Sequence, residues 1–364
     1  MNINLTSIDR VVVRGTNWVG DAVMTVPALR ALRQLFPHAH ITLATRSWAK
    51  GLFAEADFID DLLVHDGTGL RSVVQQVKQW RTHSFDVAVL FPNSLEAALV
   101  ASLSRVPLRI GYGTDGRHRL LTHPVNLPEW RSFKHEVFYY LNIIERLRRV
   151  ANHPDSGHGQ VPDGSLTVSE KRQSAALDLL RAKGVKGVNE PLGQHARPLI
   201  ALCPGSINSR AKRWPPVRFA ALADMLVAEL DAEILLIGSA AEADVSQEVL
   251  AQMRNPGTML TGQTGLDELV AVLSISDLLV TNDTGPAHIA SALGRPTLVI
   301  FGPTNPLTTR PFSEMGEIVR EPPDCAPCML RDCPIDHRCM TAISPDQVFK
   351  RAQAMLTSNL QFVI

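Results

Sequence analysis

The apolar positions of the first 100 residues switch repeatedly between a strand pattern and a helix pattern. A short β-branched run over 11–14 ends at Gly15, and apolar residues then take helical spacing from Asp21 to Leu35. The same alternation predicts strands over 41–45, 62–64 and 86–91 and helices over 48–56 and 70–80. Strands that alternate with helices predict a parallel sheet.

A second series of the same kind fills the C-terminal half. It predicts strands over 199–203, 233–237, 278–281 and 296–301, and helices over 169–182, 217–230, 241–253, 266–275 and 285–293. Residues 150–166, between the two series, are rich in Pro, Gly, His, Asp and Ser. We interpret them as the connection between domains or as a long surface loop.

Chain length sets the domain organisation. A chain of 364 residues exceeds the size at which one hydrophobic core keeps growing. We therefore expect an α/β protein of two doubly wound, Rossmann-like domains whose strand ends face a common cleft. The expected divisions are residues 1–165, residues 166–343 and a final segment of residues 344–364.

Composition narrows the function classes less than the pattern does. Lys plus Arg equals Asp plus Glu at 36 each, so net charge gives no argument for a nucleic-acid partner or for gross membrane attraction. The apolar share of 45% excludes a disordered chain. Because no stretch approaches the roughly 20 apolar residues of a membrane helix, we expect a cytoplasmic protein.

The loop after the first predicted strand carries polar groups at the start of a helix. It reads GTNWVGDAVMTVPAL over 15–29, without the GxGxxG spacing of a dinucleotide site. Asp21 either points into the cleft or simply complements the helix dipole. Asn17 and Trp18 favour a binding role, because a large aromatic in so tight a loop is unusual unless it packs over a ligand or another domain.

The segment CPGSINSRAKRWP, residues 203–215, is suited to a diphosphate. Flexible backbone and two cations follow the end of a strand, although a solvated basic turn would give the same pattern. The candidate phosphate-binding residues are Gly205, Ser206, Lys212 and Arg213. Trp214 is expected in the core, and Cys203 is expected as a small buried side chain.

The segment TNDTGPAHIASALGRP, residues 281–296, places a helix N-terminus directly after an apolar strand. Asn282, Asp283 and Thr284 offer side chains there, and Thr284 and Gly285 offer backbone N–H groups to an anion. Alternatively, Asp283 or Thr284 is only the N-cap and His288 a satisfied helical histidine. Beyond the strand that ends at residue 237, Glu242 stands where a carboxylate commonly accepts hydrogen bonds from a ribose.

Taken together, these motifs resemble a known family. The combination of NWVGDAVMTVPAL, FPNS, CPGSINSRAKRWP, TNDTGPAHIASAL and FGPT, in that order, is similar to the bacterial ADP-heptose:lipopolysaccharide heptosyltransferases of glycosyltransferase family 9. The resemblance extends from about Val11 to about Val348, and the NWVGD and AKRWP forms resemble the heptosyltransferase II branch.

The resemblance implies a GT-B fold and an inverting, metal-independent transfer of L-glycero-D-manno-heptose from ADP-heptose to the first heptose of the lipopolysaccharide inner core. It implies that the N-terminal domain binds the acceptor, that Asp21 is the catalytic base and that Lys212 is a catalytic, phosphate-binding lysine. The implied nucleotide-sugar residues are Gly205, Ser206, Arg213, Glu242, Asp283, Thr284, Gly285 and His288, and the candidate acceptor residues are Asn17, Trp18, Asn93 and Arg119. The final segment would be a helix that crosses back to the first domain.

Charge in the N-terminal half is consistent with an anionic acceptor. Residues 101–150 hold nine Lys or Arg against four Asp or Glu, although a solvated helix face explains Arg146, Arg148 and Arg149 equally well. The implied partners are ADP-heptose and a Kdo–lipid A–heptose acceptor. Because that acceptor is lipid-anchored, the resemblance also implies peripheral contact with the cytoplasmic face of the inner membrane. The sequence does not indicate the oligomeric state.

Four cysteines crowd into DCAPCMLRDCPIDHRC. Cys325, Cys328, Cys333 and Cys339 are compatible with a structural zinc ion or an iron–sulfur cluster, with free thiols or with a local disulfide. Transfer itself needs no cofactor under the resemblance, and the lack of a DxD pair points the same way.

Three rival functions stay open. One is a heptosyltransferase acting at another core position, because acceptor choice resides in the first domain. The second is a nicotinamide-dependent oxidoreductase, which the lack of GxGxxG disfavours. The third is a non-catalytic nucleotide-binding or metal-sensing module. The presence of both Asp21 and Lys212 disfavours this third function.

Overall fold

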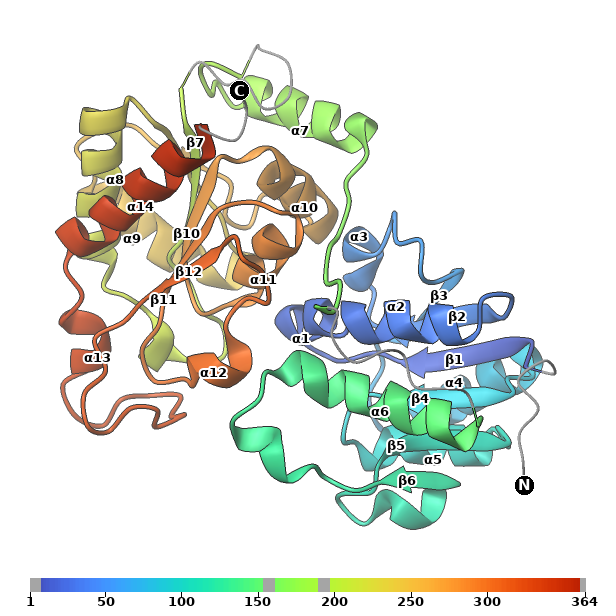
Figure 1. Ribbon diagram of the computed structural model, residues 1–364. Coiled ribbons are helices and arrows are strands. Elements are labelled where there is room, and N and C mark those ends of the chain that lie inside the picture. Colours follow the sequence, from blue (N-terminus) through green and yellow to red (C-terminus); the bar gives the residue numbers. More distant parts are fainter. Residues whose placement is uncertain (1–7, 153–160, 189–196, 361–364) are drawn as a thin grey trace. The chain divides into compact units, whose positions relative to one another are not determined.

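The computed structural model describes residues 8–152, 161–188 and 197–360. They divide into two compact units, residues 1–164 and residues 165–364, so the second unit begins one residue before the predicted boundary (Figure 1). Part of the predicted connection, residues 153–160, lies outside the described residues. No helix among the described residues is long and apolar enough to cross a membrane.

Unit 1 is built on a six-stranded sheet. All its strand pairs are parallel, and the strand order is β3-β2-β1-β4-β5-β6. The strands are β1 (Arg10–Arg14), β2 (His40–Thr45), β3 (Asp61–Val64), β4 (Val87–Leu90), β5 (Leu108–Tyr112) and β6 (His123–Val125). The helices are α1 (Val19–Met24), α2 (Val26–Leu35), α3 (Ala49–Leu52), α4 (Gly69–His83), α5 (Leu95–Leu103), η2 (Arg117–Leu120), η3 (Glu129–Ser132) and α6 (Glu136–Val150).

Unit 2 repeats this arrangement with its own six strands. The order β12-β11-β10-β7-β8-β9 is the order of unit 1 read from the other side, again parallel. The strands are β7 (Leu199–Cys203), β8 (Glu233–Leu236), β9 (Thr258–Met259), β10 (Leu278–Asn282), β11 (Thr297–Ile300) and β12 (Gly316–Val319). The helices are α7 (Glu170–Ala182), η4 (Arg210–Lys212), α8 (Pro216–Leu230), η5 (Ala240–Glu242), α9 (Ala243–Gln252), α10 (Leu266–Ile275), α11 (Gly285–Ala292), α12 (Pro306–Thr309), α13 (Arg338–Thr341) and α14 (Pro345–Leu360).

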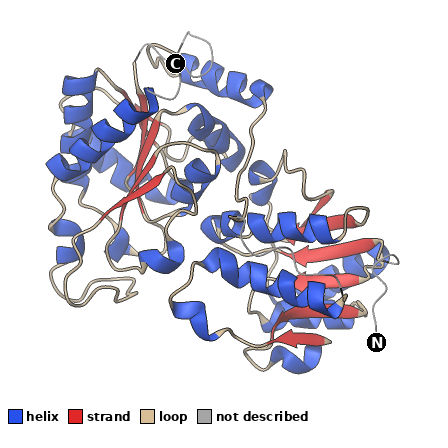
Figure 2. Ribbon diagram, viewed as in Figure 1, coloured by secondary structure: helices blue, strands red, loops and turns tan. Residues whose placement is uncertain are grey.

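Helices cover both faces of each sheet (Figure 2). The central strands β1, β7 and β10 are therefore almost wholly buried, which explains why they read as continuous apolar runs rather than alternating ones. The doubly wound α/β class is thus confirmed for each unit. In this topology the strand order reverses between β1 and β4 and again between β7 and β10, and ligands of such sheets bind at the carboxyl ends beside that reversal.

Several predicted elements differ from the observed ones. The predicted helix over 48–56 is only the four-residue α3, because the chain turns at Phe53. The predicted helix over 21–35 is two helices that meet at Thr25, because Pro27 occupies the first turn of α2 and cannot donate a backbone hydrogen bond inside a continuous helix. The predicted helix over 241–253 begins as the short η5 before α9.

The final helix, α14, places Val348, Phe349 and Ala352 in the hydrophobic core of unit 2, together with Trp214. Trp214 is 0% exposed, as its predicted place in the core requires. The interpretation of α14 as a helix that returns to the first domain stays a prediction.

Candidate functional site

The loops at the strand-order reversal of unit 2 are joined by one buried amide. The Asn282 side chain donates from Nδ2 to the carbonyls of Pro204 (2.7 Å) and Gly205 (3.1 Å). Its Oδ1 accepts from the backbone N–H of Trp214 at 3.0 Å. Asn282 is 0% exposed, so the expectation that it offers its side chain to a ligand is wrong, and its role is to hold three backbone segments together.

Beside this amide, Lys212 and Asp283 form an ion pair. Lys212 Nζ lies 2.9 Å from Asp283 Oδ2 and donates to the Asp283 carbonyl at 3.3 Å. The Thr304 hydroxyl donates to the same Oδ2 at 2.7 Å. The Asp283 side chain is 5% exposed and that of Lys212 26%, so the lysine is the partner that solvent and ligands can reach. The structure thus brings together two predicted donor-site residues and adds Thr304, whose only sequence signal is the FGPT motif.

Glu242 is more deeply built into the fold than a ribose contact requires. Its Oε2 accepts from the backbone N–H (2.9 Å) and the hydroxyl (2.7 Å) of Ser239, which completes a capping box at η5. A Cβ atom at Gly205 would come within 2.5 Å of the Glu242 carboxyl carbon, so the residue at 205 must be glycine for the carboxylate to fit. Glu242 is 5% exposed, and its role toward a ribose stays a prediction.

The other predicted donor residues divide into fixed and accessible ones. Arg213 donates from Nε (3.2 Å) and Nη2 (3.1 Å) to the Ser206 carbonyl and so fixes the loop after β7. Ser206 and His288 are buried. Thr284 is the N-cap of α11, as the alternative interpretation had it, yet its side chain makes no capping hydrogen bond. Thr284 and Gly285 are half-buried, so the start of α11 is open to an anion.

Cys203, the last residue of β7, is buried beneath these donor-site loops. It is 1% exposed, and burial raises the pKa of its thiol to about 12, so it stays protonated. This confirms the expectation of a small buried side chain rather than a reactive thiol.

In unit 1, Asp21 lies in the first turn of α1, a helix that packs against α6. A second carboxylate, Glu136, lies in the first turn of α6. Burial and, to a smaller extent, the negative charge of Asp21 raise the pKa of Glu136, while Arg131 opposes the shift. Burial followed by the charge of Asp21 also raises the pKa of Tyr140. The negative charge of Asp21 therefore acts on Glu136 and Tyr140 of α6. The role of Asp21 as a general base stays a prediction.

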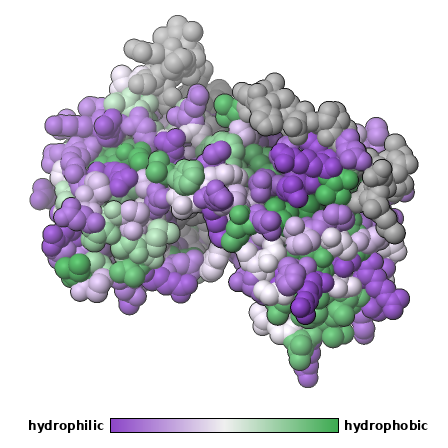
Figure 3. All heavy atoms as spheres, turned by 60° about the horizontal axis from the view of Figure 1, so that its bottom comes forward, coloured by the Kyte–Doolittle hydropathy of each residue, from purple (hydrophilic) through white to green (hydrophobic). Residues whose placement is uncertain are grey.

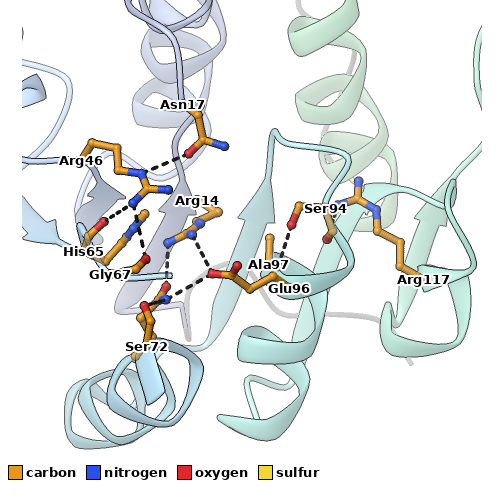
Figure 4. A network of polar contacts seen from close by, with 11 residues as sticks. Arg14, Asn17, Arg46, His65, Gly67, Ser72, Ser94, Glu96, Ala97 and Arg117 are labelled. Atoms are coloured by element: carbon orange, nitrogen blue, oxygen red, sulfur yellow. Dashed lines mark hydrogen bonds and ion pairs between the residues drawn. The ribbon is translucent and has the colours of Figure 1, made fainter. Parts of the chain in front are cut away.

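A polar network runs along the carboxyl ends of β1 to β3 (Figure 4). Arg14, 6% exposed, donates to Gln76 Oε1 at 2.7 Å and pairs with Glu96 at 3.5 Å. Burial lowers the pKa of Arg14 to about 10. Arg46, which follows β2, donates from Nε to Asn17 Oδ1 at 3.4 Å and from Nη1 to the His65 carbonyl at 3.3 Å. The Asn17 side chain is thus held by an arginine from the end of the neighbouring strand β2.

The predicted acceptor residues are only partly brought together. Asn93 donates to the Tyr139 hydroxyl at 2.7 Å and accepts from Arg117 Nη2 at 3.1 Å. Arg117 is 0% exposed and also donates to the Tyr112 carbonyl at 2.7 Å, so this member of the basic stretch is a structural arginine and cannot meet a ligand. Arg119 is exposed in η2, and Trp18 is 56% exposed.

The four clustered cysteines form no disulfide in the structure. Among the described residues, no group of three or more His, Cys, Asp or Glu side chains is arranged to hold a metal ion. The geometry therefore gives the zinc and iron–sulfur interpretations no support.

Comparison with known proteins defines the class. The model of the family described as glycosyltransferase family 9 (heptosyltransferase) matches residues 73–338, and the chain belongs to that family. The lipooligosaccharide heptosyltransferase 2 of Haemophilus influenzae is 30% identical, covering 85% of this chain and 88% of its own length. The lipopolysaccharide heptosyltransferase 2 of Escherichia coli K12 is 28% identical with the same coverage.

A solved structure agrees. That of the Escherichia coli ADP-heptose lipopolysaccharide heptosyltransferase II superposes with a TM-score of 0.79 at 26% identity, covering 96% of this chain and 99% of that chain. The resemblance stated from the motifs and the GT-B type of fold are confirmed. The site residues remain predictions, and so does the cleft between the domains.

Proposed function

We propose that this chain transfers L-glycero-D-manno-heptose from ADP-heptose to the first heptose of the lipopolysaccharide inner core. The observation that carries the proposal is the Lys212–Asp283 pair beside the open start of α11, at the strand-order reversal of unit 2. A partly exposed lysine and free backbone N–H groups in one place are suited to a diphosphate. Similarity to heptosyltransferase 2 proteins supports the choice of sugar and acceptor.

The proposed transfer inverts the configuration at the anomeric carbon of the heptose and needs no metal ion. Asp21 takes the proton of the acceptor hydroxyl, the hydroxyl oxygen bonds to the anomeric carbon, and the bond to the ADP phosphate oxygen breaks. Lys212 and the N-terminus of α11 neutralise the charge that develops on the leaving diphosphate. In the donor site, Arg213 and Asp283 position these groups, and Glu242, Gly205, Ser206 and His288 form the wall around them.

The acceptor and the membrane are proposed to meet unit 1. Phe133 is 61% exposed and Leu127 45%. Arg131 lies between them in the sequence and Lys134 follows Phe133, and this mixture of exposed apolar and basic residues is suited to peripheral contact with an anionic surface. In Figure 3, hydrophobic residues are interspersed with hydrophilic ones over the face shown. Co-sedimentation with anionic vesicles should fall in a Phe133→Ser variant and stay unchanged in Leu70→Ser, a leucine of α4 that is 82% exposed. Equal sedimentation of all three proteins would contradict the contact.

The test of the main proposal is heptose transfer in EDTA from ADP-heptose to mono-heptosylated Kdo₂-lipid A. The Asp21→Asn variant should lose at least about 100-fold in kcat while retaining ADP affinity, as expected for a general base. Asp61→Asn, an exposed carboxylate of β3, serves as the matched control. Turnover only on a different core acceptor would favour another heptosyltransferase specificity. Failure of the parent protein to bind ADP would overturn the proposal.

A metal at the cysteines is a separate question from transfer. Metal analysis of the purified protein decides between a structural ion at Cys325, Cys328, Cys333 and Cys339 and free thiols. Turnover in EDTA then tests metal independence.

A further inference from the structure

The cysteine-bearing segment packs against the loop that carries the donor-site lysine. Residues 325–341, here called the strap, are the orange-red loop together with α13 in Figure 1. The Ala211 N–H donates to the Arg331 carbonyl at 2.9 Å. The Ser209 hydroxyl lies 3.3 Å from the Leu330 carbonyl and 3.2 Å from that of Arg331. These bonds attach η4, whose last residue is Lys212, and its N-cap Ser209 to the strap.

The shortest of these contacts comes from a histidine. His337 Nε2 lies 2.6 Å from the carbonyl oxygen of Ala211, the residue before Lys212. A carbonyl oxygen can only accept, so Nε2 carries the proton in this contact. The bond ends on the peptide unit that joins Ala211 to Lys212 and thus fixes the direction in which the lysine leaves the backbone.

The strap fixes His337 in turn. His337 has a φ of 57°, in the left-handed region, and its N–H donates to Cys333 Sγ at 3.3 Å. Its carbonyl accepts from the N–H groups of Met340 (2.9 Å) and Thr341 (3.0 Å) in α13. Backbone strain at a residue held on both sides is typical of a position with a specific task.

The strap also reaches the second partner of the ion pair. The Met329 N–H donates to the Pro303 carbonyl at 2.9 Å, and Pro303 precedes Thr304, whose hydroxyl bonds Asp283. A Cβ at Gly302 would come within 3.2 Å of Cys339 Sγ. The strap therefore contacts both loops that set the positions of Lys212 and Asp283.

We propose that the strap is a positioning device for the donor diphosphate site and that His337, through its bond to the Ala211 carbonyl, is the residue that directs Lys212 toward the diphosphate. The inference rests on the proposed function, since it assigns Lys212 to the diphosphate. His337 touches neither substrate and acts through the lysine.

The test uses two substitutions of similar size at the same strained backbone position. His337→Leu removes the donor, and His337→Gln keeps an N–H donor, so backbone strain is common to both. By calorimetry, His337→Leu should weaken ADP binding about 3- to 10-fold, the range for one lost hydrogen bond, and His337→Gln should restore most of it. Ile335→Ala, at a strap side chain that is 68% exposed, should bind ADP like the parent.

A double-mutant cycle separates positioning from general stability. In a Lys212→Ala background, His337→Leu should change ADP affinity less than 2-fold, because the group it directs is gone. In heptose transfer, His337→Leu should lower kcat/KM for ADP-heptose while leaving KM for the acceptor unchanged. Equal ADP binding by His337→Leu and the parent, or the same loss with and without Lys212, overturns the inference. Failure of the parent itself to bind ADP overturns the proposed function instead.

Discussion

The ion pair between Lys212 and Asp283 permits a quantitative prediction about stability. Asp283 is 5% exposed and has two charge-satisfying partners, Lys212 Nζ at 2.9 Å and the Thr304 hydroxyl at 2.7 Å. In Lys212→Met the carboxylate stays buried with one neutral donor. Breaking a fully buried pair in this way costs about 3–5 kcal/mol. Because the lysine side chain is 26% exposed, water compensates part of this, and we expect a loss of about 2 kcal/mol.

The assay is urea unfolding of the parent, Lys212→Met and the double variant Lys212→Met/Asp283→Asn at pH 7. The double variant leaves no buried unpaired charge and should recover at least half of the lost stability, although it should not recover heptose transfer. Lys171→Met, an exposed lysine of α7, controls for the removal of a positive charge. A Lys212→Met protein as stable as the parent, or a double variant less stable than the single one, would refute the reasoning.

Three further predictions concern groups that hold the site. Burial and the charges of two arginines lower the pKa of His65 from 6.5 to about 4, so the unfolded chain binds this proton first as the pH falls. The parent should therefore lose about 2 kcal/mol of folding stability between pH 8 and pH 5 from this group. In thermal unfolding, His65→Gln should remove that part of the pH dependence of stability. Gly205→Ala should lower the folding stability by about 2 kcal/mol because its Cβ meets the Glu242 carboxylate. In the double variant Gly205→Ala/Glu242→Ala the loss of stability should be smaller than the sum of the two single losses, and additive losses in urea unfolding would exclude the clash. Asn282→Asp replaces a donor to two carbonyls with a buried charge and should lower stability by about 3 kcal/mol by urea unfolding, whereas an unchanged midpoint would mean that the buried amide does not join the loops.

Much of the fold follows from the strand and helix periods because the sheets are buried on both faces. The strand over 199–203 and the helix over 266–275 agree with β7 and α10 residue for residue. The elements that the pattern did not predict include short or half-exposed ones. β9 has two residues, and β12 is an edge strand of mixed burial, so neither shows a continuous apolar run.

The grouping of the candidate donor residues could be predicted from the order of strands, basic loop and helix start. The sequence indicated a candidate diphosphate site from a lysine after one strand end and a helix start after another, and the structure places both at the strand-order reversal of unit 2. Their role toward a diphosphate stays a prediction. The sequence did not reveal that Arg117 is buried or that Asn282 is a clamp, because an arginine on a basic stretch and a polar residue after a strand look alike whether they face water or backbone carbonyls.

The sequence by itself determined the α/β class, the positions of the glycine-rich and basic loops and the resemblance to family 9, because these depend on local periodicity and on the order of short motifs. The tertiary structure alone decided which polar groups pair. Lys212 and Asp283 are separated by 71 residues and His337 and Ala211 by 126. Their contacts arise from the parallel strand order, which brings distant strand ends to one edge of a sheet, and no local pattern along the chain records that order.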